Sequence, residues 1–229
     1  MSSGGVVLVH GLWSNPDDWQ WVRQGLASAG VLVRVPDLPS HRSGSAGLVA
    51  DAEDVRAAIR SLSGPVVVVG WSYGGDVISV AAAAEASVRL LIYVAAVPEP
   101  AHGATDTQWI DHDPHVLLQH DNIFVLDNEW WLTEEAGRTF AASVVEHLRR
   151  HPRRAAAVKA VSVPQPAAAW ADIPTTVLLG RNDALIPEHA VTWAVDHLSD
   201  GRLLDTDHFI LFRHPDAICR VALEALRVG

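Results

Sequence analysis

The hydrophobic positions of this chain form short, almost uninterrupted runs that alternate with longer amphipathic stretches. The runs are rich in valine and leucine, which is typical of parallel strands covered on both faces. Six runs are expected to be strands: Val6–His10, Val31–Val35, Val66–Gly70, Leu90–Val94, Thr176–Leu179 and Arg202–Leu204. The stretches between them predict five helices: Asp17–Ala29, Ala46–Leu62, Gly75–Ala86, Glu188–Leu198 and Asp216–Arg227. This alternation predicts a doubly wound α/β sheet with right-handed crossovers.

Three of the expected helices have clear start signals. In "NPDDW", Asn15 is an N-cap, Pro16 takes the first helical position, and two carboxylates follow at the positive end of the helix dipole. Pro187 and Pro215 begin later helices in the same way.

One long segment interrupts the alternation. From about Pro98 to Trp170 no strong strand is visible, and the composition shifts to His, Asp, Trp and Pro. A structureless loop of that length is uncommon in a compact domain, so the segment is expected to be a mostly helical insert. The chain is then one structural domain, with a core of residues 1–97 and 171–229 and an insert of residues 98–170.

Composition narrows the class of protein. The 229 residues are 49% hydrophobic and 19% charged, as expected for a globular protein with a sizeable core. The formal net charge of −10 argues against a nucleic-acid partner, and the one basic run, residues 147–154, is expected to be a solvated helix face. No signal peptide or membrane-length apolar stretch is visible, so we expect a soluble, cytoplasmic protein without a membrane partner.

Disulfide and metal chemistry are not expected. Cys219 is the single cysteine, has no CxxC partner, and falls in an apolar helical pattern typical of a core residue. His112 and His115 have helical spacing, but Pro114 between them disfavours a regular helix. We therefore expect no metal and no other cofactor.

The candidate nucleophile is Ser72, in the G-x-S-x-G pattern Gly70-Trp71-Ser72-Tyr73-Gly74. A nucleophile on a tight strand-to-helix turn has a strained backbone, and small residues are needed two positions before and after it. The turn projects Oγ outward and points the next backbone N–H, that of Tyr73, at the same spot. The pattern alone occurs by chance in roughly one chain in ten. The strand before it and the helix after it make it more specific.

A general base and an orienting acid are expected further along the chain. Asp183 follows the strand Thr176–Leu179, and His208 follows the last strand. The order Ser72, Asp183, His208 is the one expected for this architecture. In these roles His208 takes the Ser72 proton and later returns it to the leaving group, while Asp183 holds the imidazole tautomer.

Other assignments remain open for the acid and the base. Glu99, just beyond the strand Leu90–Val94, is the alternative orienting acid. Asp205 and Asp207 are expected to be turn residues. His10, before a glycine, is expected to be a structural histidine that shapes its loop.

An oxyanion hole needs a second donor besides the Tyr73 N–H. The loop after the first strand supplies it, because Gly11 frees the backbone to turn. The Leu12 backbone N–H is the preferred candidate, with Trp13 as the alternative.

Taken together and in order, these stretches make the chain similar to the α/β-hydrolase superfamily over nearly its whole length. The motifs that carry the resemblance are "VVLVHGLW", "VPDLPSHRSG", "VVVVGWSYGGDVI", "LIYVAAVPEP", "LLGRNDALIP" and "DTDHFILFRHP". More narrowly, the chain resembles the single-domain group of plant methyl esterases, hydroxynitrile lyases and bacterial esterase-like relatives. The resemblance implies an α/β-hydrolase fold: a mainly parallel six-stranded sheet, helices on both faces, and a helical cap insert.

The chain departs from that group at three positions. Trp71 precedes the nucleophile where the group usually has His. Phe209 follows the candidate base where the related lyases have Lys, and Leu12 stands where they have Thr. The last two departures count against cyanohydrin chemistry.

The resemblance also implies that the insert covers the active site. Aromatic side chains could then line an apolar substrate pocket, although packing between cap and core is the alternative for each of them. The pocket candidates are Trp13, Trp71, Trp109, Phe124, Trp130, Trp131 and Phe209.

The residues therefore predict a serine hydrolase that cleaves a small or medium carboxylic ester, lactone or thioester through an acyl-enzyme. A cofactor-independent lyase or C–C bond hydrolase on the same scaffold is the first alternative, and a non-catalytic ligand receptor the second. A small-molecule substrate is the expected partner, and a homodimer is left open.

Overall fold

The computed structural model describes residues 4–103, 113–119 and 123–227. Its main sheet has six strands in the order β2-β1-β3-β4-β8-β9, and every neighbouring pair is parallel. The six expected strands and the doubly wound arrangement are confirmed, with strand ends moved by at most two residues. The strands are β1 (Gly5–Val9), β2 (Leu32–Arg34), β3 (Val66–Trp71), β4 (Val88–Val94), β8 (Thr175–Gly180) and β9 (Asp200–Leu204).

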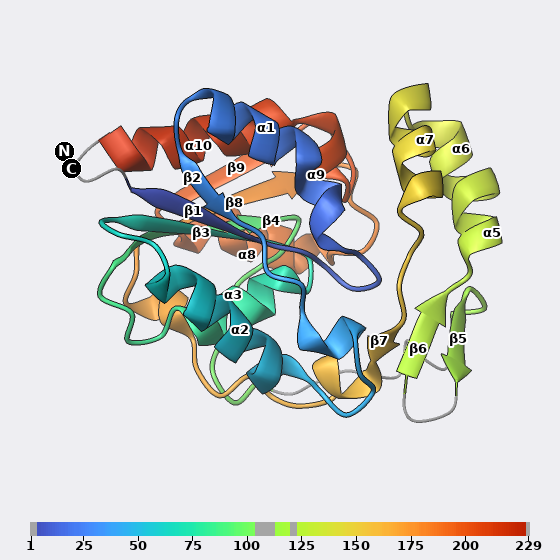
Figure 1. Ribbon diagram of the computed structural model, residues 1–229, viewed down its shortest axis with the longest axis horizontal. Helices are drawn as coiled ribbons and strands as arrows, with labels where there is room; N and C mark the ends of the chain where they lie inside the picture. The colour runs from blue at the N-terminus through green and yellow to red at the C-terminus, as the bar shows by residue number, and fades with distance from the viewer. Residues whose placement is uncertain (1–3, 104–112, 120–122, 228–229) are drawn as a thin grey trace.

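Helices cover both faces of this sheet (Figure 1). One face carries α1 (Gln20–Ser28), α9 (Ile210–Arg213) and α10 (Pro215–Arg227), and the other carries α2 (Leu48–Arg60), α3 (Gly74–Ala81) and α8 (Glu188–His197). Each face has its own apolar core. The valine run of β3 serves both, because Val66 and Val68 pack into one core and Val67 and Val69 into the other. A strand buried on both sides reads as a continuous apolar run for this reason.

The start of the first helix is as expected. Asn15 Oδ1 accepts a hydrogen bond from Asp17 N at 2.9 Å, and Pro16 begins the 3-10 turn η1 (Pro16–Trp19), which leads directly into α1. Cys219 is buried in α10, also as expected.

The insert lies between β4 and β8, on the side of the sheet away from the chain termini (Figure 1). It contains helices, but also a three-stranded antiparallel sheet in the order β5-β6-β7, which the sequence pattern did not reveal. The expected mostly helical insert is found, but the sequence pattern did not indicate these three short strands. Its elements are β5 (Val116–Gln119), β6 (Ile123–Leu126), α5 (Asn128–Trp130), the π-helical turn η4 (Trp131–Glu135), α6 (Ala136–Thr139), α7 (Ala142–Arg150) and β7 (Ala156–Ala157).

Three short 3-10 turns complete the elements: η2 (Pro39–His41), η5 (Val158–Ala160) and η6 (Ala169–Ala171). Over the described ranges, no helix combines the length and the apolar character needed to cross a membrane.

Candidate active site

Ser72 lies on a sharp turn between β3 and α3. Its φ is +53°, in the left-handed region that costs an L-residue roughly 1–2 kcal/mol. The turn is held by hydrogen bonds from Ser72 N to the Val94 carbonyl (2.9 Å) and from Gly75 N to the Ser72 carbonyl (2.7 Å). A serine held in this conformation at the carboxyl end of a central strand has the geometry expected of a nucleophile elbow.

The glycines around Ser72 are required by close packing. A Cβ atom on Gly70 would lie 2.2 Å from the Gly74 carbonyl oxygen, and a Cβ on Gly74 would lie 2.4 Å from the Val9 carbonyl oxygen. No side chain fits at either distance. The spacing of the G-x-S-x-G pattern therefore follows from the shape of this turn.

The loop after β1 packs directly against the turn. A Cβ on Gly11 would lie 3.1 Å from both Ser72 Cβ and the Trp71 carbonyl oxygen. The loop that carries Leu12 therefore lies against the turn at Gly11. Within the described residues, neither the Leu12 nor the Tyr73 backbone N–H donates to a protein acceptor, as an oxyanion hole requires.

His208 pairs with Asp183. The His208 Nδ1 atom is 2.8 Å from Asp183 Oδ2, and the Asp183 carboxylate is fully buried. Asp183 Oδ1 accepts from the backbone N–H groups of Leu185 and Ile186, at 2.9 and 3.3 Å. Because Nδ1 donates to the carboxylate, Nε2 of the neutral imidazole is left as the basic nitrogen.

This hydrogen bond decides between the two candidate acids. His208 Nδ1 is hydrogen-bonded to Asp183, not to Glu99. Glu99 is an exposed residue, and the desolvation that its carboxyl does undergo raises its pKa.

The loops that carry the acid and the base are joined through their backbones. Asn182 N donates to the Thr206 carbonyl at 2.9 Å, and Arg181 N donates to the Leu204 carbonyl at 2.8 Å. Asp207 is the turn residue that the sequence indicated, since its Oδ1 accepts from Phe209 N at 3.0 Å. Asp205 accepts a side-chain hydrogen bond from Asn182 at 3.3 Å.

His10, expected to be a structural histidine, is fully buried beside this site. Its Nδ1 lies 3.0 Å from the Gly11 carbonyl oxygen, and its Nε2 accepts from Leu38 N at 3.4 Å. Burial lowers the pKa of His10 to about 4, so the ring is neutral at neutral pH.

Trp71 makes a contact that sequence reasoning missed. Its indole Nε1 donates to the His208 backbone carbonyl at 2.9 Å, across 137 positions of sequence. The only signal in the sequence was the departure from the usual His at this position.

The side chain of Tyr73 is also anchored. Its hydroxyl donates to Asp51 Oδ2 at 2.6 Å, and the same oxygen accepts from Ser40 Oγ at 2.6 Å. Burial and the nearby Asp51 raise the pKa of Tyr73 well above its ordinary value, so the phenol remains a donor. Sequence reasoning assigned only the backbone of Tyr73 and did not find Asp51.

The aromatic pocket candidates fall into separate groups. Trp71, Trp131 and Phe209 belong to one cluster, in which the Trp131 and Phe209 rings lie 5.0 Å apart. Trp13 packs edge-on against Phe124 at 5.2 Å, beside the loop after β1.

Trp130 instead stacks on His115 at 3.8 Å, within the insert. Trp109 lies outside the described residues, as does His112. Within the described part of the chain, no group of three or more His, Cys, Asp or Glu side chains is arranged to hold a metal.

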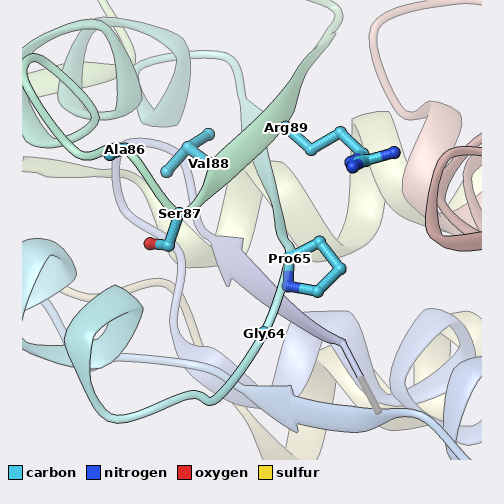
Figure 2. A pocket seen from close by; sticks show the side chains of 6 residues that line it. All are labelled: Gly64, Pro65, Ala86, Ser87, Val88 and Arg89. Carbon is cyan, nitrogen blue, oxygen red and sulfur yellow. The ribbon is translucent and has the colours of Figure 1, made fainter. Parts of the chain in front are cut away.

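A hollow of about 420 Å³ lies elsewhere on the molecule (Figure 2). It is lined by residues just before β3 and β4, including Pro65 and Ser87. This is the amino end of the sheet, whereas Ser72, Asp183 and His208 all follow the carboxyl ends of their strands. Ligands of parallel α/β sheets bind at the carboxyl ends, so the hollow is not part of the candidate site.

The family assignment follows from a profile match over most of the chain. The profile described as the alpha/beta hydrolase family matches residues 6–221. The chain belongs to this family. Among alpha/beta hydrolases, it is 28% identical over 226 residues to a pimeloyl-[acyl-carrier protein] methyl ester esterase of Nitrosomonas europaea. That match covers 91% of this chain and 86% of the relative.

Solved structures of other alpha/beta hydrolases share the fold. A pyrethroid hydrolase from Sphingobium faniae superposes with a TM-score of 0.75 at 17% identity, covering 98% of each chain. Tomato methylketone synthase I gives a TM-score of 0.79 at 14% identity, covering 99% of this chain and 98% of its own. The resemblance expected from the motifs, to alpha/beta hydrolases with plant and bacterial relatives, is confirmed.

Proposed function

We propose that this protein is a serine hydrolase that cleaves a small or medium carboxylic ester through an acyl-enzyme. The observation that carries the proposal is the buried His208–Asp183 hydrogen bond of 2.8 Å, at the same edge of the sheet as the strained Ser72 turn. The relatives add support, because one is named a methyl ester esterase and one a pyrethroid hydrolase.

The proposed first half-reaction is acylation. His208 Nε2 takes the proton from Ser72 Oγ as the oxygen attacks the ester carbonyl carbon. The carbonyl oxygen gains the negative charge, which the Leu12 and Tyr73 backbone N–H groups stabilise. The C–O bond then breaks, the alcohol leaves with the proton from His208, and the acyl group stays on Ser72.

Deacylation repeats these steps with water. His208 takes a proton from water, the hydroxide attacks the acyl carbonyl, and Ser72 recovers its proton as the acid leaves. Asp183 accepts the His208 Nδ1–H hydrogen bond and stabilises the imidazolium that forms twice in each cycle. No cofactor enters this scheme.

Labelling with a fluorophosphonate tests the proposal. Ser72 is expected to gain one phosphonyl group, seen by mass spectrometry, and hydrolysis of 4-nitrophenyl butyrate is expected to stop with it. Ser72→Ala should abolish both. The control Ser63→Ala, at an exposed serine between α2 and β3, should change neither.

Two results would contradict the proposal. One is the absence of an adduct on Ser72. The other is a Ser72→Ala variant that keeps most of its activity on a hydroxynitrile or a β-dicarbonyl substrate, which would favour lyase or C–C bond chemistry with His208 as the base.

A further inference from the structure

Trp71 stands directly before the candidate nucleophile and contacts the candidate base. It is the last residue of β3 and only 3% exposed. Its indole Nε1 donates to the His208 carbonyl at 2.9 Å. The backbone that leads into Ser72 and the backbone of His208 are therefore connected through a single side chain.

Aromatic neighbours hold this indole in place. The Trp71 ring lies 5.8 Å from the His208 ring and 6.1 Å from the rings of Phe209 and Phe212. The ring also packs near Gly11, where a Cβ would approach Trp71 Cε3 to 3.2 Å. The indole thus contacts both the loop after β1 and the loop that carries His208. It has little freedom to tilt.

His208 is in this way held at two points. Asp183 fixes the rotation of its imidazole through Nδ1, and Trp71 fixes its backbone through the carbonyl oxygen. Within the described residues, Trp71 is the donor that satisfies this carbonyl. A buried carbonyl that loses its donor shifts toward another partner or pays a desolvation cost. Losing the indole N–H would therefore displace the His208 loop relative to Ser72.

We propose that Trp71 is a positioning residue, whose indole N–H sets the distance between His208 and Ser72. This proposal rests on the proposed function, in which His208 takes the Ser72 proton. It also accounts for the chain's departure from the usual His before the nucleophile: the larger indole reaches across to the base loop.

The most direct test removes the indole N–H donor of Trp71 and keeps the shape of its ring. Trp71 is replaced site-specifically by 3-benzothienylalanine, in which sulfur stands in place of the ring N–H. The matched control is the same replacement at Trp19, which is fully buried in the same apolar cluster and whose Nε1 has no partner among the described residues. Trp71→Phe serves as a second, genetically encoded variant.

Activity is the first readout. For the Trp71 replacement, kcat on 4-nitrophenyl butyrate is expected to fall about 10- to 100-fold with KM within about twofold, since small misplacement of a catalytic group costs this much. The Trp19 replacement should leave both constants unchanged. Trp71→Phe should show the same loss of kcat.

The second readout does not depend on ester hydrolysis. The downfield proton resonance of His208 Nδ1–H, identified by its loss in Asp183→Asn, reports the His208–Asp183 pairing. It is expected to shift in the Trp71 replacement and to stay in place in the Trp19 replacement. If the wild-type protein cleaves no ester, the proposed function fails, but this resonance still tests whether Trp71 positions His208.

The proposal is overturned if the Trp71 replacement keeps wild-type kcat and an unshifted resonance. It is equally overturned if only the melting temperature falls while kcat and the resonance stay unchanged, because Trp71 would then contribute packing alone.

Discussion

Among the described residues, two Asp–His pairs are buried, and each belongs to a group that includes a serine. In the first, His208 Nδ1 lies 2.8 Å from Asp183 Oδ2. In the second, His147 Nε2 lies 3.2 Å from Asp18 Oδ1, and Ser14 Oγ donates to Asp18 Oδ2 at 2.6 Å. This second group has the same three residue types as the candidate triad, but they are arranged differently.

The difference lies in what the carboxylate does. Asp183 accepts from the imidazole and two backbone N–H groups, and no arginine bonds to it within the described residues. Asp18 instead meets the Arg153 guanidinium, with Nη2 at 2.7 Å from Oδ2. The Ser14 hydroxyl donates a hydrogen bond directly to the Asp18 carboxylate. Within the described residues no imidazole bonds to Ser14, whose hydroxyl donates to Asp18 instead, so this group lacks the Ser–His contact that nucleophile activation needs.

The second group joins the insert to the core. Asp18 and Ser14 belong to the core segment around η1, while His147 lies on α7 and Arg153 follows that helix. His151 adds an outer contact, with its Nδ1 3.1 Å from Asp17. One Asp–His pair thus serves the candidate chemistry, and the other holds the insert in place. Three predictions separate the roles of these two pairs, and a fourth extends the comparison to another carboxyl.

The largest expected effect is on the rate, in Asp183→Asn. The amide cannot stabilise the imidazolium and favours the wrong tautomer, so kcat for ester hydrolysis should fall about 10⁴-fold. The free energy of unfolding in urea should change by only about 1 kcal/mol. Retention of a tenth of the wild-type rate would remove Asp183 from the proposed mechanism.

The next effect is on stability, in Asp18→Asn. Arg153 would be left buried without its counter-charge, and the free energy of unfolding in urea should fall by about 3–5 kcal/mol. The kcat of the folded variant should stay within a few-fold of wild type. Asp17→Asn is the matched control, because its carboxylate is half-exposed and should contribute less than about 1 kcal/mol.

A smaller effect is the acid sensitivity that Asp18 confers. Burial opposes its ionisation, but Arg153 and hydrogen bonds from His147 and Ser14 outweigh burial and lower the pKa of Asp18 below its usual 3.8. Its contribution to stability is therefore present above pH 3.8 and is lost as the pH falls through the lower folded-state pKa. Between pH 5 and pH 2, urea midpoints should fall more steeply for wild type than for Asp18→Asn. Parallel curves would show that Asp18 is not the acid-sensitive group.

The smallest effect concerns a third carboxyl, that of the partly buried Asp76 in α3. Unlike the other two, it has no imidazole or cation partner within the described residues. Burial, with a contribution from the Glu99 charge, raises the pKa of Asp76 from 3.8 to about 7. The unfolded chain therefore ionises first, and stability falls as the pH rises from about 4 to 7.

Asp76→Asn should remove this cost. Its free energy of unfolding should exceed that of wild type at pH 8 and match it at pH 4. A gain of equal size at both pH values would point to packing rather than ionisation.

The elements of the core could be predicted from the sequence because burial and pattern agree there. Strands such as β3 lie between two helical layers, so their apolar runs have clear ends. In the small sheet of the insert, burial and the hydrophobic pattern do not agree. In β5, Leu117 and Leu118 are 47% and 59% exposed, so apolar residues do not mark a buried face. The hydrophobic pattern of β5 therefore did not indicate a strand.

The candidate site divides in the same way. Ser72 was found from a local turn whose glycines are sterically required, and Asp183 and His208 from their positions after strands. These are properties of short stretches and of chain order. The Trp71–His208 contact spans 137 positions, and the Asp18–Arg153 contact spans 135. No local pattern carries information on such pairs.

The sequence by itself therefore determined the parallel α/β core, the turn at Ser72, and the chain order of the candidate nucleophile, acid and base. Only the tertiary structure decided that Asp183 rather than Glu99 holds His208, that Trp71 bonds to the base loop, and that Asp18 with Ser14 and His147 is a structural group. The reason is physical. Local pattern records which face of an element is buried, whereas the partner of a buried polar group depends on how distant elements pack together.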